Sequence, residues 1–318
     1  MIKSLNYLLY RLKYRYAKEL KLNIPVDVSL ELAASCNLAC NYCYWSNPKE
    51  LPFKPGMMSW DTAQLIIADA ATIGINSLKM NYRGESTINP IFKDVTKFAK
   101  DHASGSIFID RVTNSNFMFK SDRNDIFEGL CNQTKVKVSF DSFIPDVMQK
   151  QRAKSNHSLI MKNIDIFYNH PNRKDTELVI QAVRTKLNKE EDIYGQSKRR
   201  WPDAKISIRD MVGGRVDKDI SEYENKERDF SNRQSCLQAH NRIIFDWQGN
   251  AQVCCPDLKS ELQIGNIHDE SIYHIFNSKK AKAIRKSLLD KSAFDKIDAC
   301  KNCSSHESFS GYKHPWGS

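Results

Sequence analysis

Cys36-Asn37-Leu38-Ala39-Cys40-Asn41-Tyr42-Cys43 is the most informative stretch of this chain, because it gathers three cysteines within one short loop. Soft thiolate ligands select iron–sulfur clusters, zinc or copper(I). Three ligands instead of four leave one metal valence open for another molecule to bind. We therefore expect this loop to hold a reactive metal centre.

The cysteine content favours a metalloprotein over a disulfide-stabilised fold. The chain has 9 cysteines in 318 residues and carries no secretory signal, which predicts a reduced, cytoplasmic protein. An apolar fraction of 41% is ample for a folded core. The length permits one large α/β domain with a small addition.

The formal net charge of +10 is concentrated at the start of the chain. Residues 1–21 contain six Lys or Arg and one Glu, and these charges interrupt every apolar run that could span a bilayer. Residues 1–25 therefore predict a basic amphipathic helix. Such a helix either packs on its own domain or lies on an anionic membrane, and the sequence leaves both open. No aromatic-basic motif indicates nucleic-acid binding.

Six β-rich runs alternate with helical segments along the first two thirds of the chain. The predicted strands are 26–33, 78–82, 107–112, 136–140, 178–185 and 206–211. The predicted helices are 61–73 after Ser59, 91–99, 122–130 after Ser121, and 159–168. Repeated strand–helix units predict an α/β fold with a parallel sheet. The cysteine loop follows the first strand, so it lies at the carboxyl end of the sheet, where active sites gather.

A second group of cysteines lies in the C-terminal third: Cys236, Cys254, Cys300 and Cys303. Residues 242–247 and 251–253 flank a turn at Gly249, which predicts a β-hairpin that brings Cys236 and Cys254 together. A helix over 272–289 then leads to Cys300 and Cys303, whose spacing suits one metal centre. Zinc and an iron–sulfur cluster both fit these four residues. Cys255 is expected to be a packed neighbour of the site.

The spacing of Cys36, Cys40 and Cys43, with aromatic Tyr42 before the last, resembles the Cys-x3-Cys-x-aromatic-Cys signature of the radical S-adenosylmethionine (SAM) superfamily. The resemblance implies a partial (βα)6 TIM-type barrel over 26–215. It implies a [4Fe-4S] cluster held by the three cysteines, whose fourth iron binds the amino and carboxylate groups of SAM. It also implies an electron donor such as flavodoxin or ferredoxin as a partner.

Further residues resemble the SAM-binding segments of that superfamily. Tyr82-Arg83-Gly84-Glu85-Ser86 follows the second strand, where the family carries Gly-Gly-Glu, so Gly84 and Glu85 are implied to contact SAM. Arg83 replaces the first glycine of that pattern, and Ser115 replaces the glycine expected after Asn114. The other implied cofactor contacts are Tyr42, Asn114, Ser139 and Arg152.

Residues 230–306 resemble the SPASM/twitch auxiliary-cluster domain of radical SAM enzymes, through the spacing Cys-x12-Gly-x4-Cys of Cys236, Gly249 and Cys254. The resemblance implies one auxiliary [4Fe-4S] cluster bound by Cys236, Cys254, Cys300 and Cys303. No cysteine follows Cys303. We therefore expect a shortened domain of β-hairpin and helix without a second auxiliary cluster, followed by a tail over 307–318.

Together these features predict an oxidoreductase. The resemblance implies reductive cleavage of SAM to a 5′-deoxyadenosyl radical, which abstracts a hydrogen atom from a sugar or another small polar or anionic substrate. The fully ligated auxiliary cluster would accept the substrate's electron, as in radical SAM alcohol dehydrogenases. Arg209 and Asp210 end the sixth predicted strand and are candidates for handling the hydroxyl proton.

Three alternatives remain open. The first is a peptide-modifying maturase, although residues 1–25 are too few for a separate leader-binding domain before the first strand. The second is a radical epimerase in which the thiol of Cys131 returns a hydrogen atom. The third is a non-enzymatic zinc-binding adaptor.

Overall fold

The computed structural model describes residues 2–103, 108–211, 220–224, 236–255, 257–292, 294–301 and 303. The predicted tail over 307–318 and the first residue of the predicted third strand, Ile107, lie outside these ranges. Within the described residues, no helix is long and apolar enough to cross a membrane.

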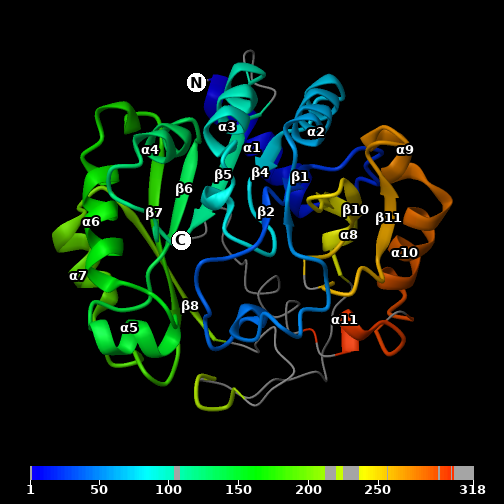
Figure 1. The fold of residues 1–318 in the computed structure, drawn as a ribbon. Coiled ribbons are helices and arrows are strands. Elements are labelled where there is room, and N and C mark those ends of the chain that lie inside the picture. The colour runs from blue at the N-terminus through cyan, green and yellow to red at the C-terminus, as the bar shows by residue number, and fades with distance from the viewer. Residues whose placement is uncertain are drawn as a thin grey trace.

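A nine-stranded sheet forms the centre of the molecule, and all six predicted strands belong to it (Figure 1). They pair in parallel and in chain order. Their bounds are β1 (Asp27–Leu30), β4 (Ser77–Lys79), β5 (Asp110–Ser115), β6 (Lys135–Ser139), β7 (Glu177–Arg184) and β8 (Lys205–Asp210). This arrangement confirms the predicted partial barrel of TIM type.

Alternation along the strands separates the two sides of the sheet. In β6, Val136 and Val138 are fully buried and join the core beneath the helices. Lys135, Lys137 and Ser139 point to the other side, because successive side chains of a strand alternate. We call that second side the barrel interior. Burial of the valine side supplies the hydrophobic stabilisation of the barrel wall.

Helices connect the parallel strands and cover their outer side (Figure 1). They are α2 (Trp60–Thr72), α3 (Phe92–Asp101), α4 (Asn124–Cys131), α5 (Pro145–Gln151), α6 (His157–Tyr168) and α7 (Ile193–Arg200). Ser59 caps α2 as predicted, since its Oγ accepts from Thr62 N–H at 3.2 Å. The predicted start of α4 after Ser121 is wrong: the Ser121 hydroxyl donates to Asn163 Oδ1 and α4 begins at Asn124. The sequence pattern missed α5 and α7.

The C-terminal strands extend the same sheet. They are β9 (Arg242–Phe245), β10 (Asn250–Gln252) and β11 (Gln263–Asn266), and α8 (Gln238–Asn241) precedes them. The antiparallel pairing of β9 with β10 confirms the predicted hairpin. Strand β9 also pairs in parallel with β1 on the side opposite β4. The hairpin is therefore built onto the first strand of the barrel.

The predicted helix over 272–289 is interrupted. Helix α9 (Ile272–Asn277) ends at Ser278, whose Oγ caps α10 (Lys279–Leu289) by accepting from Ala281 N–H at 3.1 Å. A short α11 (Asp298–Lys301) follows. A serine side chain that satisfies a free N–H favours the start of a new helix over continuation of the old one.

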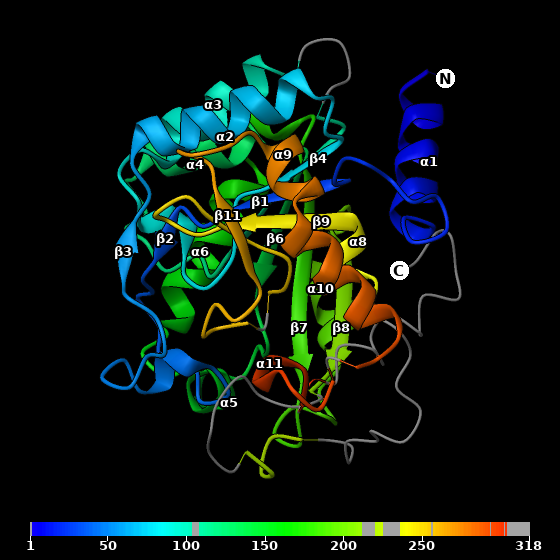
Figure 2. The ribbon, with the colours of Figure 1, turned by 90° about the vertical axis from the view of Figure 1, so that its right-hand side faces the viewer.

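Helix α1 (Ile2–Arg15) lies at the amino ends of the barrel strands. The hydroxyl of Tyr10 donates to Asp27 Oδ1, at the first residue of β1, at 3.2 Å. Figure 2 shows α1 at the opposite end of the sheet from the segment that carries the first cysteines and the short strands β2 (Ala33–Ala34) and β3 (Gly56–Met57). The helix therefore packs on the closed end of the barrel, away from the cysteine loop.

Candidate metal and cofactor site

The cysteine loop leaves the carboxyl end of β1 and β2 and is anchored by backbone hydrogen bonds. Ala39 N–H donates to the carbonyl of Ala153, beyond α5, at 2.9 Å. Within the loop, Cys43 N–H donates to the carbonyl of Cys40 at 3.0 Å. These contacts hold Cys36, Cys40 and Cys43 on one compact turn at the end of the barrel where the sequence predicted a site.

Polar side chains from two other segments reach the cysteine sulfurs. Asn116 Nδ2 donates to Cys36 Sγ and Arg152 Nη1 donates to Cys40 Sγ, both at 3.9 Å. Burial raises the pKa of Cys36 to about 12, and the charge of Glu85 adds to the effect. Burial also raises the pKa of Cys40 to about 11, against the lowering effect of Arg152. Because thiols must lose their protons to bind iron, donors aimed at the sulfurs favour the ligated form.

Arg152 is held by a carboxylate next to the loop. Its Nε and Nη2 donate to the two oxygens of Asp141 at 2.7 and 3.1 Å. Tyr42 donates its hydroxyl to Asp141 Oδ2 at 2.5 Å, so Asp141 joins both predicted cofactor residues. A bidentate Arg–carboxylate pair has fixed geometry, which leaves Nη1 of Arg152 pointing at Cys40. Contact of Tyr42 and Arg152 with SAM remains a prediction.

Glu85 ties together the turns that surround the loop. Its Oε1 accepts from Thr87 Oγ1 at 2.7 Å, and its Oε2 accepts from Asn116 N–H at 2.8 Å. Burial raises the pKa of this carboxyl group against these hydrogen bonds. Glu85 therefore stabilises the local fold. Its contact with the ammonium group of SAM stays a prediction.

Gly84 is required by a close backbone contact. A Cβ on Gly84 would lie 2.1 Å from the carbonyl oxygen of Ala33 and 2.3 Å from that of Ser35. Glu85 N–H donates to the same Ser35 carbonyl at 2.8 Å. Only glycine lets the turn after β4 approach the base of the cysteine loop this closely.

Arg83 stands where the family pattern has glycine. It is buried and contacts several segments, which the sequence pattern did not predict. Its Nε and Nη2 donate to the two carboxylate oxygens of Glu31 at 2.7 and 2.6 Å. Its guanidinium lies 4.2 Å from the ring centre of Phe53. Its carbonyl accepts from Trp45 Nε1 at 2.6 Å. Arg83 thus connects β1 with the segment that follows the last cysteine of the loop.

The remaining predicted residues lie on the barrel strands. Asn114 is on β5, and its buried Oδ1 has no hydrogen-bond partner within the described residues. Asn116, two residues later, reaches Cys36 instead, although no sequence signal distinguished it. Ser139 ends β6, while Arg209 and Asp210 end β8 at the same edge of the sheet. The cofactor and catalytic roles of these residues remain predictions.

The second cysteine group converges at the far edge of the same sheet. Burial raises the pKa of Cys254, and the neighbouring charges of Cys255, Cys236, Cys303 and Cys300 raise it further. Burial raises the pKa of Cys236 to about 11 and that of Cys300 to about 12. These mutual effects indicate that the four thiols share one neighbourhood, while their role as ligands of one cluster stays a prediction.

Within the described part of the chain, no three His, Cys, Asp or Glu side chains converge closely enough to hold a single metal ion. In a [4Fe-4S] cluster, by contrast, each thiolate binds a different iron. The three loop cysteines, of which Cys36 and Cys40 receive N–H donors, and the four cysteines that include Cys254 are donor sets that fit such clusters.

Hydrogen bonds connect the barrel with the second cysteine group. Tyr82, three residues after β4, donates its hydroxyl to Gln252 Oε1 at 2.9 Å and to the carbonyl of Asp257 at 3.1 Å. Gln252 ends β10, two residues before Cys254. The segment that carries Cys254 is therefore fixed directly to the segment that carries Gly84 and Glu85.

Cys131 lies elsewhere, on the outer side of the barrel. Its Sγ is 3.3 Å from Nδ1 of His170, and it ends α4 in the helical layer. This position gives the epimerase alternative no support from Cys131. Cys255, predicted to be a packed neighbour, lies close enough to Cys254 and Arg242 for its charge to raise the pKa of both groups.

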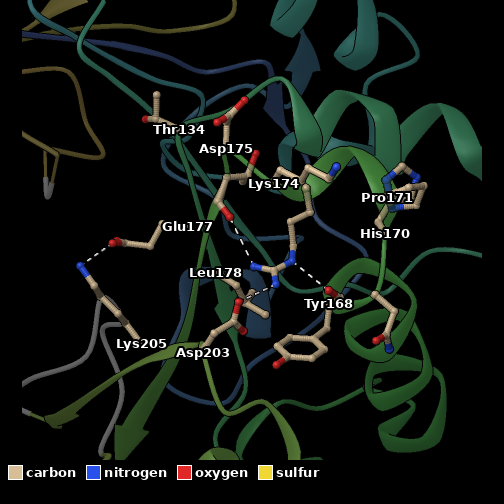
Figure 3. A pocket seen from close by; sticks show the side chains of 13 residues that line it. Thr134, Tyr168, His170, Pro171, Lys174, Asp175, Glu177, Leu178, Asp203 and Lys205 are labelled. Atoms are coloured by element: carbon tan, nitrogen blue, oxygen red, sulfur yellow. Dashed lines mark hydrogen bonds and ion pairs between the residues drawn. The ribbon is translucent and has the colours of Figure 1, made fainter. Parts of the chain in front are cut away.

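A surface pocket lined by His170 lies apart from the two predicted metal-binding groups of cysteines (Figure 3). It lies at the amino ends of β7 and β8, next to Glu177 and Lys205. Arg173 in its wall donates to Asp203 Oδ2 at 2.8 Å and to the carbonyl of Tyr168 at 2.9 Å. The polar groups of Arg173 are thus used within the fold, which indicates a structural contact.

Two comparisons of sequence match parts of the chain. The family model SPASM, described as an iron-sulfur cluster-binding domain, matches residues 236–304. PqqA peptide cyclase from Bradyrhizobium diazoefficiens is 28% identical over 119 residues, which are 37% of this chain and 29% of that protein. The aligned part thus spans less than a third of that relative.

Solved structures share the fold over most of the chain. BtrN in complex with AdoMet and 2-DOIA is similar with a TM-score of 0.58 and 16% identity, over 88% of this chain and 93% of that one. The structure of anSMEcpe with bound AdoMet is similar with a TM-score of 0.65 and 14% identity, over 88% of this chain and 83% of that one. A further structure of anSMEcpe contains AdoMet and a Cp18Cys peptide.

The cysteine loop after the first barrel strand, the partial barrel and the C-terminal match agree with one another. Residues 236–304 match an iron-sulfur cluster-binding domain of the SPASM family, and most of the chain shares the fold of structures that contain AdoMet.

Proposed function

We propose that this enzyme oxidises a sugar or another small polar substrate, with an auxiliary [4Fe-4S] cluster as electron acceptor. The observation that carries the proposal is the convergence of Cys236, Cys300 and Cys303 on Cys254, directly beside the barrel. Four cysteines saturate a cluster and leave no iron free to bind substrate. Electron transfer is then the task that such a cluster performs.

When bound, SAM and the cluster at Cys36, Cys40 and Cys43 supply a 5′-deoxyadenosyl radical that removes a hydrogen atom from the substrate. The residues of the chain orient and support this chemistry. Asp141 fixes Arg152 over Cys40, and Asn116 is fixed at Cys36 by its backbone bond to Glu85. Preorganised donors at the sulfurs hold the ligands in their charged form.

Completion of a two-electron oxidation requires the substrate to lose a proton and a second electron. Arg209 and Asp210 are proposed for the proton, because they end a barrel strand at the edge where the cysteine loop lies. Flavodoxin or ferredoxin is proposed as the reductant of the first cluster. The second electron leaves toward the cysteine group at Cys254.

A peptide-modifying maturase is the second candidate. PqqA peptide cyclase is a relative by sequence, and one structural neighbour holds a peptide together with AdoMet. Cross-linking or oxidation of a peptide would use the same two cysteine groups. We place it second because charged side chains, among them Lys135 and Lys137 of β6, line the barrel interior.

The first experiment measures iron and sulfide per chain after anaerobic reconstitution. We expect about eight irons in the wild type and about four in Cys36→Ala/Cys40→Ala/Cys43→Ala, as two [4Fe-4S] sites require. Cys131→Ala is the matched control and should keep the wild-type content. Bound zinc with about four irons would remove the electron-accepting cluster from the proposal, and zinc without iron would favour the adaptor.

Product analysis then separates the reaction classes. In a dehydrogenation, each 5′-deoxyadenosine formed is matched by one oxidised product, and a screen of sugars and small polar compounds should reveal it. Peptides that alone stimulate 5′-deoxyadenosine formation would favour the maturase. Incorporation of solvent deuterium at an unoxidised carbon would indicate an epimerase and contradict the dehydrogenase proposal.

A further inference from the structure

The barrel interior carries a row of side chains below the cysteine loop, and all of them except Val179 are polar. The strand register aligns Asn114 of β5 with Lys137 of β6, Lys137 with Val179 of β7, and Val179 with Lys205 of β8. Lys137 lies two residues before Ser139, which ends its strand, so this row is one layer deeper than the edge that holds the cysteines.

The acidic side chains around this row already have cationic partners. Asp27 pairs with Lys79, Asp110 lies 3.9 Å from Lys135, and Glu177 lies 3.5 Å from Lys135. Glu177 also pairs with Lys205. These carboxylates of the interior are therefore already paired with lysines, and the interior has more cationic than anionic side chains in this row.

Lys79, Lys135 and Lys205 each form an ion pair in the described part of the chain, whereas Lys137 forms none with a described residue. Burial lowers the pKa of Lys137 to about 8, and the charges of Lys135, Arg209 and Lys79 lower it further, while Asp110 opposes them. A partly buried ammonium group among other cations is unfavourable unless an anion joins it.

Asn114 offers a second unused group beside Lys137. Its Oδ1 is buried and accepts no hydrogen bond from the described residues, and the register makes it the cross-strand neighbour of Lys137. A buried carbonyl oxygen without a donor is costly in a finished fold. One ligand with an anionic group and a hydroxyl group would satisfy both residues.

We propose that the substrate is a hydroxylated anion whose carboxylate or phosphate group binds Lys137 and whose hydroxyl group donates to Asn114, which then contacts the substrate in place of the SAM contact that the resemblance implies for it. This inference rests on the proposed function, because it names the substrate class of the same barrel. It distinguishes a sugar acid or sugar phosphate from a neutral sugar. It also disfavours a neutral peptide segment as the group bound at this depth.

Trace acetylation of lysines in the reconstituted holoenzyme, quantified residue by residue by mass spectrometry, tests the site with simple probes. Inorganic phosphate and malonate are the anionic probes, and inositol is the neutral one. At about pH 8, where half of the Lys137 side chains should be unprotonated, an anion that raises its pKa by about one unit should reduce its labelling several-fold. Lys162, an exposed lysine of α6, is the internal control.

Protection of Lys137 by phosphate and malonate, but not by inositol, would support the proposal, and protection by phosphate alone or malonate alone would specify the anion. Equal labelling of Lys137 with and without the anions would overturn it, as would protection by inositol alone. A Lys137 that is unlabelled without any probe would overturn it too, because the interior would be closed to small molecules.

Two variants separate this site from the SAM site. Phosphate binding to the variants is measured by calorimetry. Lys137→Met should lose phosphate binding, Lys137→Arg should retain it, and Lys162→Met should bind phosphate as the wild type does. If Lys137→Met instead abolished SAM binding, Lys137 would belong to the SAM site and the proposal would be overturned. Failure of the wild type to cleave SAM would refute the proposed function and leave the anion result standing.

An independent observation concerns helix α1 and the turn that follows it. The side chains of Tyr10 and Ala17 are buried against the barrel, with 3% and 2% of their surfaces exposed. Leu5, Leu8, Leu9, Leu12 and Leu20 are 41–57% exposed. At 100° per residue, Leu5, Leu9 and Leu12 form one stripe on the side of the helix away from Tyr10. The helix therefore contacts the barrel through Tyr10 and leaves a leucine stripe exposed on its other side.

We infer that this leucine stripe lies on an anionic lipid surface. Exposed Lys13 and Arg15 flank the stripe, and the basic excess of the chain is concentrated in this segment. Basic residues beside an exposed apolar stripe are typical of helices that lie in the membrane interface. The charge favours anionic lipid over a second copy of this equally basic helix.

Flotation of the holoenzyme with lipid vesicles tests the inference. Binding to vesicles of phosphatidylcholine with phosphatidylglycerol, but not of phosphatidylcholine alone, is expected. Leu9→Ser/Leu12→Ser should reduce the bound fraction roughly tenfold or more, because two apolar contacts are lost. Leu65→Ser, which changes an exposed leucine of α2, is the matched control.

Absence of wild-type binding to anionic vesicles would overturn the membrane inference. Binding that is unaffected by Leu9→Ser/Leu12→Ser would overturn it as well, since the stripe would then be irrelevant. A wild-type dimer that the same variant dissociates would assign the stripe to a second copy of the chain.

Discussion

At the scale of single residues, the departure of Arg83 from the family pattern has a physical explanation. A glycine at this position would leave the carboxylate of Glu31 buried without its bidentate partner. The side chains of Arg83 and Glu31 are 2% and 0% exposed. Arg83 thus stabilises the turn that brings Gly84 and Glu85 next to the cysteine loop.

We expect Arg83→Met to lower the free energy of unfolding by about 3–5 kcal/mol, because removal of one partner leaves a buried charge uncompensated. Urea unfolding measures the change. Arg83→Met/Glu31→Leu should recover much of the loss, since both charges are then absent. Arg123→Met, which breaks an exposed pair with Asp125, should change stability by only about 0–1 kcal/mol. Equal effects of Arg83→Met and Arg123→Met would contradict this account.

Gly84 gives a second prediction at this scale. In Gly84→Ala, the new Cβ would collide with the backbone carbonyls of Ala33 and Ser35, so the base of the cysteine loop must shift. We expect a loss of about 1–3 kcal/mol in stability and a lower iron content after reconstitution. Gly195→Ala is the control for iron content, because the nearest atoms to its Cβ belong to the side chain of Asp192, which caps α7 and not the cysteine loop. Unchanged iron content in Gly84→Ala would refute the packing argument.

At the scale of elements, α8 joins the second cysteine group to the barrel and carries a buried histidine. Burial lowers the pKa of His240, and the charges of Arg285 and Lys18 lower it further. The unfolded chain then binds a proton more readily than the folded one. Stability is therefore complete above the ordinary histidine pKa and falls as the pH drops below it toward the folded value.

We expect the free energy of unfolding to be lower at about pH 5.5 than at about pH 7.5, with part of the difference due to His240. Denaturant unfolding at the two pH values measures it. His240→Gln should reduce the difference, whereas substitution of exposed His274 should leave it unchanged. A pH dependence that is identical in wild type and His240→Gln would contradict the assignment.

At the scale of the whole molecule, the C-terminal strands complete the barrel sheet. Strand β9 pairs with β1 over four residues, from Asp27 with Arg242 to Leu30 with Phe245. Ile243 and Phe245 are fully buried in the same core as Val28 and Leu30. Loss of β9 would expose both an unpaired strand edge and this apolar surface.

We therefore expect residues 1–224 expressed alone to aggregate or to lack a cooperative thermal transition. The same chain ending at residue 303 should stay folded, which makes it the matched control. Size-exclusion chromatography and circular dichroism provide the measurement. A monomeric 1–224 fragment with cooperative unfolding would show that the barrel does not depend on β9.

The sequence by itself determined the chemistry and most of the elements. Cysteine spacing is local, so three ligands in one loop could be recognised without a structure. The six barrel strands and the hairpin at Gly249 followed from short-range patterns and turn chemistry, and the strand pairings agree with them. The break at Ser278 was missed because serine within a helical pattern is a weak signal until its Oγ is seen to cap α10.

The tertiary structure alone decided which groups meet. Arg83 with Glu31, Asn116 with Cys36, and Arg152 with Asp141 are contacts between distant segments, and no local pattern encodes them. The pairing of β9 with β1 was likewise invisible, since a strand edge carries no mark of its partner in the chain. The register of β5, β6 and β7 decides which side chains are neighbours of Lys137. It therefore also decides whether a carboxylate of the chain lies close enough to pair with Lys137.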